Sequence, residues 1–126
     1  MLENARVHSG FAVDDMDKAR EFYGETLGLD VSDGPPGLFV TAADGRQTLI
    51  YHKPDFVPAT YTILNFEVAD VDATVGELNS RGIEMERYDG FDQDEKGILR
   101  MPGLPAGAWF TDPAGNILSV HEPMPA

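Results

Sequence analysis

The side chains best able to do chemistry in this chain are a few histidines, amides and carboxylates in predicted strands. The 126-residue sequence contains no cysteine, which excludes disulfides and thiolate chemistry and leaves His, Asp and Glu as metal ligands. His8 stands in the first predicted strand, where an imidazole could line a pocket, act as a general base or be structural. Asn65 and Glu67 share one face of a later strand, and polar groups there must be paired or solvated by a cavity. Both could line a ligand pocket, and the alternative for Glu67 is an ion pair with an arginine such as Arg100.

Aromatic residues form a second group that could bind a ligand. They could stack on a planar molecule, or they could fill the core as aromatic residues in strands commonly do. The polar run at 112–116 predicts a tight turn, and the acidic run at 92–95 predicts a solvated loop without the calcium-loop pattern. No Ser-His-Asp or phosphate-loop signature is visible. The aromatic group consists of Tyr61, Tyr88, Phe91, Trp109 and Phe110.

A repeated pattern predicts the elements that position these residues. A strand followed by an acid-capped helix occurs at residues 7–16 and again at 62–71, and Phe11 of the first copy aligns with Phe66 of the second. In each copy alternate residues point to opposite faces, so one face packs on a helix and the other faces a cavity. The helices are expected over about 15–27 and from Asp70 to Gly82. Asp14 or Asp15 would cap the first and Asp70 the second, and each would end at a Gly.

The remaining strands complete two modules of the form βαβββ. We expect strands over 29–31, 38–41 and 47–52 in the first module, and over 83–88, 108–111 and 117–121 in the second, with a short one at 98–101. The prediction is therefore an α+β fold of two repeated modules. One domain, residues 1–126, would contain module 1 at about 6–54 and module 2 at about 61–122. The acidic, Gly- and Pro-rich stretch 89–105 is an insertion in the second copy and a candidate rim.

The composition limits the classes of molecule that this protein is expected to bind. The formal net charge is −13 with only nine Lys and Arg, which argues against nucleic acid and anionic membranes and would suit a cationic ligand. No apolar run is long enough to span a bilayer, and the N-terminus does not have the pattern of a signal peptide. We expect a cytoplasmic protein.

Several motifs together resemble the vicinal-oxygen-chelate superfamily, which includes glyoxalase I, bleomycin-resistance proteins and extradiol dioxygenases. The resemblance implies that the two modules form an open half-barrel cavity and that the protein is a symmetric homodimer. It covers about residues 6–122, but it does not specify an activity because the superfamily carries many. The motifs are His8-x-x-Phe11-x-Val13-Asp14-Asp15-Met16, then Phe22-Tyr23 and Leu27-Gly28, and finally Trp109-Phe110-x-Asp112-Pro113-x-Gly115-Asn116.

The resemblance also implies four metal-ligand positions, of which this chain fills one. Transferred by position, they are His8, Ile50, Ile63 and Ser119. Ile50 is the counterpart of Ser119 when His52 is aligned with His121. A single imidazole does not hold a metal at useful affinity. No metal cofactor is expected. The alternative is a relocated divalent ion held by His8 with Glu67, His52 or His121.

The sequence therefore predicts a protein that binds a small organic ligand without the metal of the family. Two alternatives stay open. The first is a metal-dependent lyase, isomerase or dioxygenase that acts on a substrate with vicinal oxygens, and the second is an interaction module with a filled cavity. The predicted pocket consists of His8, Ile50, His52, Ile63, Asn65, Glu67, Trp109, Ser119 and His121.

Overall fold

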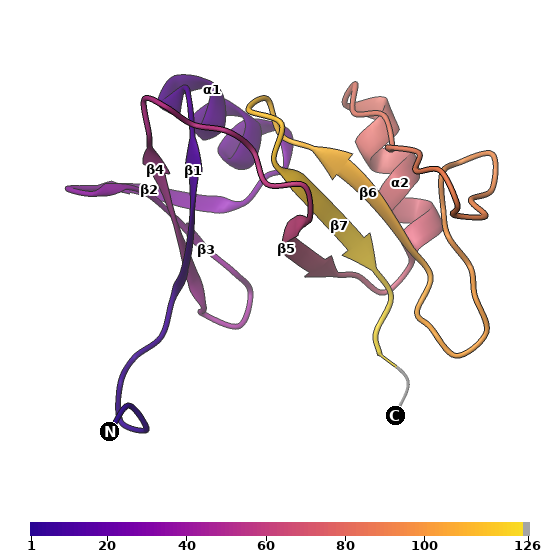
Figure 1. Cartoon of the computed structure of the whole chain (residues 1–126), viewed down its shortest axis with the longest axis horizontal. Coiled ribbons are helices and arrows are strands. Elements are labelled where there is room, and N and C mark those ends of the chain that lie inside the picture. Colours follow the sequence, from indigo (N-terminus) through magenta and orange to yellow (C-terminus); the bar gives the residue numbers. More distant parts are fainter. Residues whose placement is uncertain (125–126) are drawn as a thin grey trace. The chain divides into compact units, whose positions relative to one another are not determined.

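The computed structural model describes residues 1–124. The chain forms two compact units, and the boundary between them in the sequence falls between Pro58 and Ala59. Each unit has one sheet and one helical segment (Figure 1). The first unit contains β1 (Ser9–Val13), α1 (Met16–Arg20), the π-helix η1 (Glu21–Thr26), β2 (Asp30–Gly34), β3 (Gly37–Thr41) and β4 (Gln47–His52). The second contains β5 (Thr62–Glu67), α2 (Val71–Ser80), β6 (Gly107–Thr111) and β7 (Ile117–His121).

The sheet of the first unit has the order β1-β4-β3-β2, with β1 and β4 parallel. Its helical segment begins where Asp15 accepts a hydrogen bond from the backbone N–H of Lys18 at 3.1 Å. The predicted single α-helix over 15–27 is instead a short α-helix that widens into η1, with the N–H of Leu27 bonded to the carbonyl of Phe22. Gly24 of η1 approaches β2 so closely that a Cβ there would lie 2.8 Å from a methyl group of Val31.

The core of the first unit lies on the sheet face that the helices cover. Phe11, Ile50 and Leu38 are side by side across β1, β4 and β3, and all three are buried. The ring of Tyr23 from η1 lies 5.8 Å from that of Phe11 and 5.1 Å from that of Phe22. Phe11 therefore lies on the face of β1 that packs on the helical segment.

The second unit repeats this plan with the sheet order β5-β7-β6, again with its first and last strands parallel. Asp70 caps α2 by accepting from the N–H of Ala73 at 3.1 Å. The helix ends before Gly82, whose φ of +83° is a left-handed conformation that suits glycine. Buried residues of α2 and of the facing strands form the core, among them Val71, Val75, Leu78, Ala108, Phe110, Leu118 and Val120.

The predicted strand at 83–88 does not form. Only the N–H of Glu86 bonds to the neighbouring strand, at the carbonyl of Trp109. The side chain of Gln93 takes two of the backbone groups that a further strand would have paired, because it accepts from the N–H of Tyr88 and donates to the carbonyl of Glu86. The predicted strand at 98–101 is reduced to isolated bridges at Leu99. The second module is thus βαββ, while the α+β class and the repeat are confirmed.

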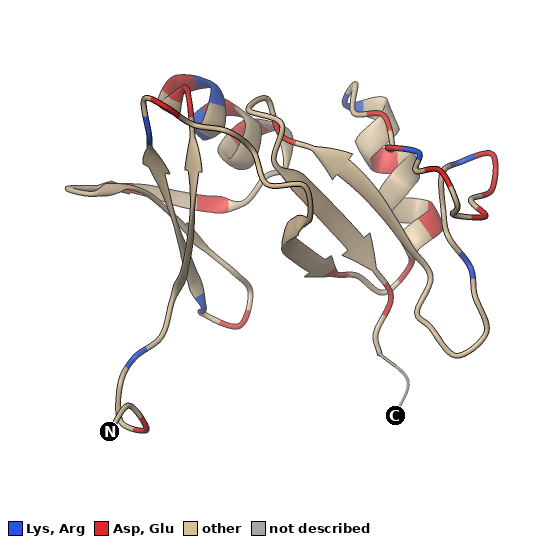
Figure 2. Ribbon diagram, in the orientation of Figure 1, with Lys and Arg blue, Asp and Glu red and all other residues tan. Residues whose placement is uncertain are grey.

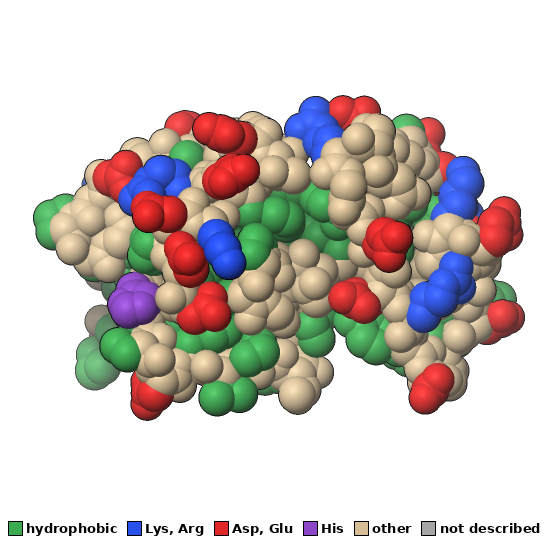
Figure 3. All heavy atoms as spheres, turned by 90° about the horizontal axis from the view of Figure 1, so that it is seen from above, with side chains coloured by type: hydrophobic (Ala, Val, Ile, Leu, Met, Phe, Trp, Pro, Cys, Tyr) green, Lys and Arg blue, Asp and Glu red, His purple; other side chains and the backbone are tan. Residues whose placement is uncertain are grey.

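Acidic side chains lie mostly on helices, loops and strand ends of both units (Figure 2). On the face drawn in Figure 3 the basic side chains are dispersed among more numerous acidic ones. None of the helices in the described part of the chain is long and apolar enough to cross a membrane.

Candidate ligand-binding site

One face of the β5–β7–β6 sheet is opposite the face that packs on α2, and we call it the open face. Strand register identifies its residues. Asn65 of β5, Ser119 of β7 and Trp109 of β6 are neighbours across the sheet, and Glu67 and His121 form the next pair. Thr111 of β6 pairs with Ile117 of β7, so both also belong to the open face. Five of these residues, Asn65, Glu67, Trp109, Ser119 and His121, belong to the predicted pocket.

An aromatic pocket of about 360 Å³ lies at one end of the open face. Trp109 is in its centre, with its ring 5.4 Å from that of Phe91 and 5.8 Å from that of Tyr88. The indole N–H donates to the hydroxyl of Thr62 at 3.2 Å, which ties the ring of a β6 residue to β5. Phe110, the fifth predicted aromatic, is a buried core residue. The lining residues are Thr60, Tyr61, Thr62, Tyr88, Phe91, Trp109 and Ile117.

The segment 83–105 brings Tyr88 and Phe91 to Trp109. The half-buried side chain of Gln93 holds this segment in place. Its amide donates to the carbonyl of Gly97 at 2.8 Å, in addition to its hydrogen bonds with the backbone of Tyr88 and Glu86. Asp94 holds the following turn by accepting from the backbone N–H groups of Lys96 and Ile98 at 2.9 Å each. Sequence reasoning missed Gln93, and a lone Gln in an acidic loop gives no local signal of this role.

Three of the polar residues of the open face have hydrogen-bond partners within the second unit. Ser119 donates to the side-chain oxygen of Asn65 in a short hydrogen bond. The Nδ1 of His121 lies 2.7 Å from the carbonyl oxygen of Glu122, which fixes the ring. Glu67 is exposed beside His121. The Glu67–Arg100 ion pair does not form, since Arg100 pairs instead with Asp72 at 2.7 Å and Asp94 at 3.6 Å.

The pKa of the pocket residue Tyr88 is shifted. Burial of the phenol raises its pKa above the ordinary value, and the negative charge of Glu86 raises it further. The phenol therefore stays protonated well above neutral pH and can donate a hydrogen bond.

The predicted residues of the first unit differ from those of the second. His8 is exposed and precedes β1, and His52 is exposed at the end of β4. Ile50 is fully buried beside Phe11 on the helix-covered face, not on the cavity side. The physical reason is a one-residue error in the predicted alignment of the repeats. Phe11 pairs with Ile50 whereas Phe66 pairs with Val120, so the counterpart of Ser119 is Leu49, and a one-residue slip exchanges the two faces of a strand.

Ile63 and the closing turn also have defined places. The register of β5 shifts between Thr62 and Leu64, so Ile63 is the extra residue of a β-bulge and does not line the pocket. Asp112, which is buried, accepts from the N–H groups of Ala114 and Asn116 at 3.0 and 2.8 Å and so forms the predicted turn.

The donor atoms present do not fit the metal of the resembled family. With Leu49 in place of Ile50, its four positions hold one imidazole, one hydroxyl and two aliphatic side chains, which is too few ligands for a zinc-type site. Within residues 1–124 no three His, Asp or Glu side chains form a group that could hold a metal ion. In the second unit Glu67 and His121 supply only two candidates.

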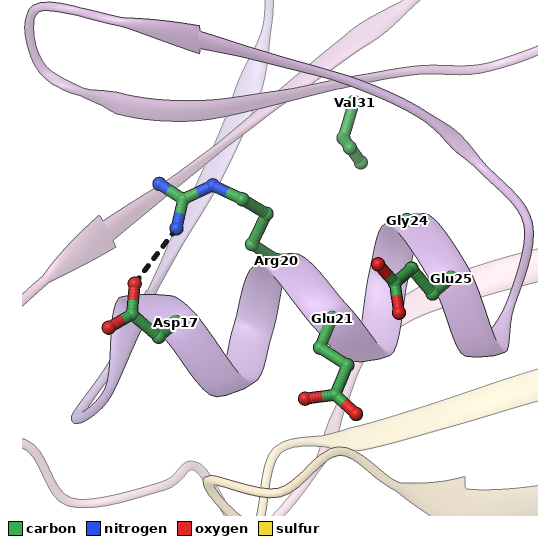
Figure 4. Close-up of a pocket in the computed structure, with 6 residues that line it drawn as sticks. All are labelled: Asp17, Arg20, Glu21, Gly24, Glu25 and Val31. Atoms are coloured by element: carbon green, nitrogen blue, oxygen red, sulfur yellow. Dashed lines mark hydrogen bonds and ion pairs between the residues drawn. The ribbon is translucent and has the colours of Figure 1, made fainter.

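Two further hollows are lined by residues other than those of the predicted ligand pocket. One, of about 480 Å³, lies between the helical segment and β2 of the first unit (Figure 4). It is lined largely by charged residues, and its guanidinium, Arg20, is bonded to Asp17 and Asp33. The other, of about 460 Å³, is formed by residues 100–106 and 122–123.

A comparison with protein-family models assigns the chain to one family. The model of the Glyoxalase/Bleomycin resistance protein/Dioxygenase superfamily matches residues 6–120. No protein with a curated description matches the sequence.

Solved structures give the same fold. TnmS3, an antibiotic binding protein from Streptomyces sp. CB03234, is 28% identical with a TM-score of 0.67, and the match covers 94% of this chain and 98% of that one. A glyoxalase family protein from Enterococcus faecalis is 21% identical with a TM-score of 0.68 over 97% and 100% of the two chains. The fosfomycin resistance protein FosX from Listeria monocytogenes is 17% identical with a TM-score of 0.70 over 96% and 94%.

Proposed function

This chain belongs to the Glyoxalase/Bleomycin resistance protein/Dioxygenase superfamily, and on that premise we propose that it binds a small planar organic molecule on the open face of the β5–β7–β6 sheet, without a metal. The observation that carries the proposal is the aromatic pocket. Trp109 of β6 meets Tyr88 and Phe91 of the segment 83–105 at a surface hollow rather than in the core. Aromatic side chains supply large flat contact areas for a planar ligand.

Three features support this proposal. The pocket volume of about 360 Å³ is in the range of small-molecule sites. Its lining is mostly apolar, with the hydroxyls of Thr62 and Tyr88 as orienting groups. TnmS3, at 28% identity, is described as an antibiotic binding protein, so a relative of similar sequence binds a small molecule.

The single tryptophan makes the test direct, because Trp109 contributes the only indole N–H signal in an amide correlation spectrum. The neutral planar probe is 1-naphthylmethanol. We expect a saturable shift of the Trp109 indole signal, and Trp109→Leu should weaken binding in calorimetry by about tenfold through lost ring contact. Leu104→Ala is the control, since Leu104 is an exposed apolar residue of the same unit that lines a different hollow. An unmoved indole signal, or equal losses in both variants, would overturn the proposal.

No observation favours a metal-dependent lyase, isomerase or dioxygenase over binding, because the donor atoms at the family positions do not form a metal site. A chelator-stripped sample should accordingly melt at the same temperature with and without Zn²⁺, Ni²⁺, Mn²⁺ or Fe²⁺. The single-domain organisation, half-barrel cavity, homodimer and cytoplasmic location expected from the sequence stay predictions.

A further inference from the structure

The aromatic pocket is bordered by a carboxylate that none of its lining residues neutralises. Glu86 is half-buried, and its backbone N–H bonds to the carbonyl of Trp109 at 2.7 Å. Its Oε1 accepts from the hydroxyl of Thr111 at 3.3 Å. Thr111 and Trp109 lie on the same face of β6, and the register partner of Thr111 is the pocket residue Ile117. The carboxylate of Glu86 is therefore held at the edge of the pocket on the open face.

The nearby cations are engaged elsewhere. In the part of the chain that the structure describes, no ion pair joins Glu86 to a Lys or Arg side chain. Arg87, its neighbour in sequence, donates to the carbonyl of Glu95 at 2.8 Å. None of the seven lining residues is basic. A negative charge thus stands beside the aromatic rings with no protein cation against it.

The raised pKa of Tyr88 agrees with the position of the Glu86 carboxylate at the edge of the pocket. After burial, the charge of Glu86 is the second cause that raises the pKa of the Tyr88 phenol, which means that the carboxylate acts across the pocket wall. A charge that disfavours a phenolate at this wall favours a cation there.

We propose that the aromatic pocket takes a cationic aromatic ligand, an aryl ring that carries an ammonium or amidinium group, and that Glu86 is the residue that selects its charge. The ring of the ligand stacks on Trp109, and its cationic group lies at the Glu86 carboxylate beside Thr111. Aromatic faces themselves attract cations, and a half-buried carboxylate is screened less than the exposed acidic residues elsewhere on the surface. This inference rests on the proposed binding function and adds the class of ligand.

Three probes of one shape separate charge from stacking: 1-naphthylmethylammonium, 1-naphthylmethanol and 1-naphthoate, each titrated by calorimetry into the whole protein. We expect the cation to bind about five- to tenfold more tightly than the alcohol, and the carboxylate to bind most weakly. Glu86→Gln should remove most of the preference for the cation while changing the affinity for the alcohol less than about twofold. The Gln amide oxygen still accepts from Thr111, so the fold is retained, and the melting temperature checks this.

Glu84→Gln is the matched control, because it removes the same charge from an exposed position two residues away. It should leave the preference nearly unchanged. A measurement on the unmodified protein makes the test independent of any variant: the aminomethylene protons of the cation should show a nuclear Overhauser effect to the γ protons of Glu86.

The outcomes separate the two proposals. Equal affinity for all three probes, an undiminished preference in Glu86→Gln, equal losses in Glu84→Gln, or no Overhauser effect at Glu86 would overturn the charge selection while binding of the alcohol at Trp109 stands. Failure of every probe to bind would overturn the binding function and this inference together.

Discussion

The two units of this chain share the parallel pairing of their first and last strands and an Asp helix cap, but they differ at one edge of the sheet, where the second unit carries the aromatic pocket. In both, the first and last strands are parallel neighbours, and the strand before the last is antiparallel to the last. In the first unit β2 completes the sheet, and the ring of Phe39 lies over Gly34 of that hairpin, where a Cβ would be 2.8 Å from it. In the second unit the segment 83–105 replaces that strand and directs Tyr88 and Phe91 to Trp109.

This difference separates what builds the scaffold from what builds the site. In each unit the helix-covered face of the sheet carries the core, and this face is lined by buried hydrophobic residues in both units. The pocket depends on a departure from the repeat, because a regular edge strand would pair its backbone groups and leave no free segment to carry rings over the sheet.

The largest expected effects test the register that assigns residues to the two faces. Ile50→Ala and Leu118→Ala each remove a fully buried side chain and should lower the free energy of unfolding in urea by about 2–5 kcal/mol. Leu49→Ala, at the half-exposed counterpart of Ser119, is the control and should cost clearly less. If Leu49→Ala cost as much as Ile50→Ala, the assignment of faces in the first unit would be wrong.

Replacement of Gln93 tests whether the departure from the repeat depends on one side chain. Gln93→Ala leaves the N–H of Tyr88 and the carbonyls of Glu86 and Gly97 without their partner, and we expect a loss of about 1–3 kcal/mol in urea unfolding. Binding of 1-naphthylmethanol should weaken with it. Gln47→Ala in the first unit, whose amide makes an exposed bond to Thr41, should leave both quantities unchanged. Unaltered probe affinity in Gln93→Ala would show that the rings hold their places without it.

The helix caps test the equivalence of the two units. Asp15 and Asp70 each accept one backbone N–H bond at 3.1 Å, so Asp15→Ala and Asp70→Ala should each lower the free energy of unfolding by about 1 kcal/mol. Asp→Asn at each position, which keeps a capping side chain, should recover most of the loss. Losses that differ severalfold between the two positions would contradict equivalent capping.

The smallest expected effect concerns Asp72 at the start of α2. The hydrogen bond from Arg100 is the main reason that the pKa of Asp72 is lowered, with Lys96 adding to it. Because the folded-state pKa is below the unfolded one, this stabilisation is present at neutral pH and disappears as the pH falls through the folded-state pKa. Asp72→Asn should therefore lower the melting temperature slightly at pH 7 and not in strong acid. Asp17→Asn is the matched variant in the first unit, and a pH-independent effect of Asp72→Asn would contradict the account.

The sequence by itself determined the repeat, both Asp caps, the helix-facing side of each copy and the turn at 112–116, because these features depend on local spacing and on the chemistry of neighbouring residues. Only the tertiary structure decided the site. In the structure the counterpart of Ser119 is Leu49, one residue before the predicted Ile50. No local pattern encodes this difference of one residue. It places Ile50 in the core. The pocket likewise depends on long-range contacts: Trp109 meets Tyr88 and Phe91 because Gln93 folds the intervening segment, and such an arrangement depends on loop closure rather than on periodicity.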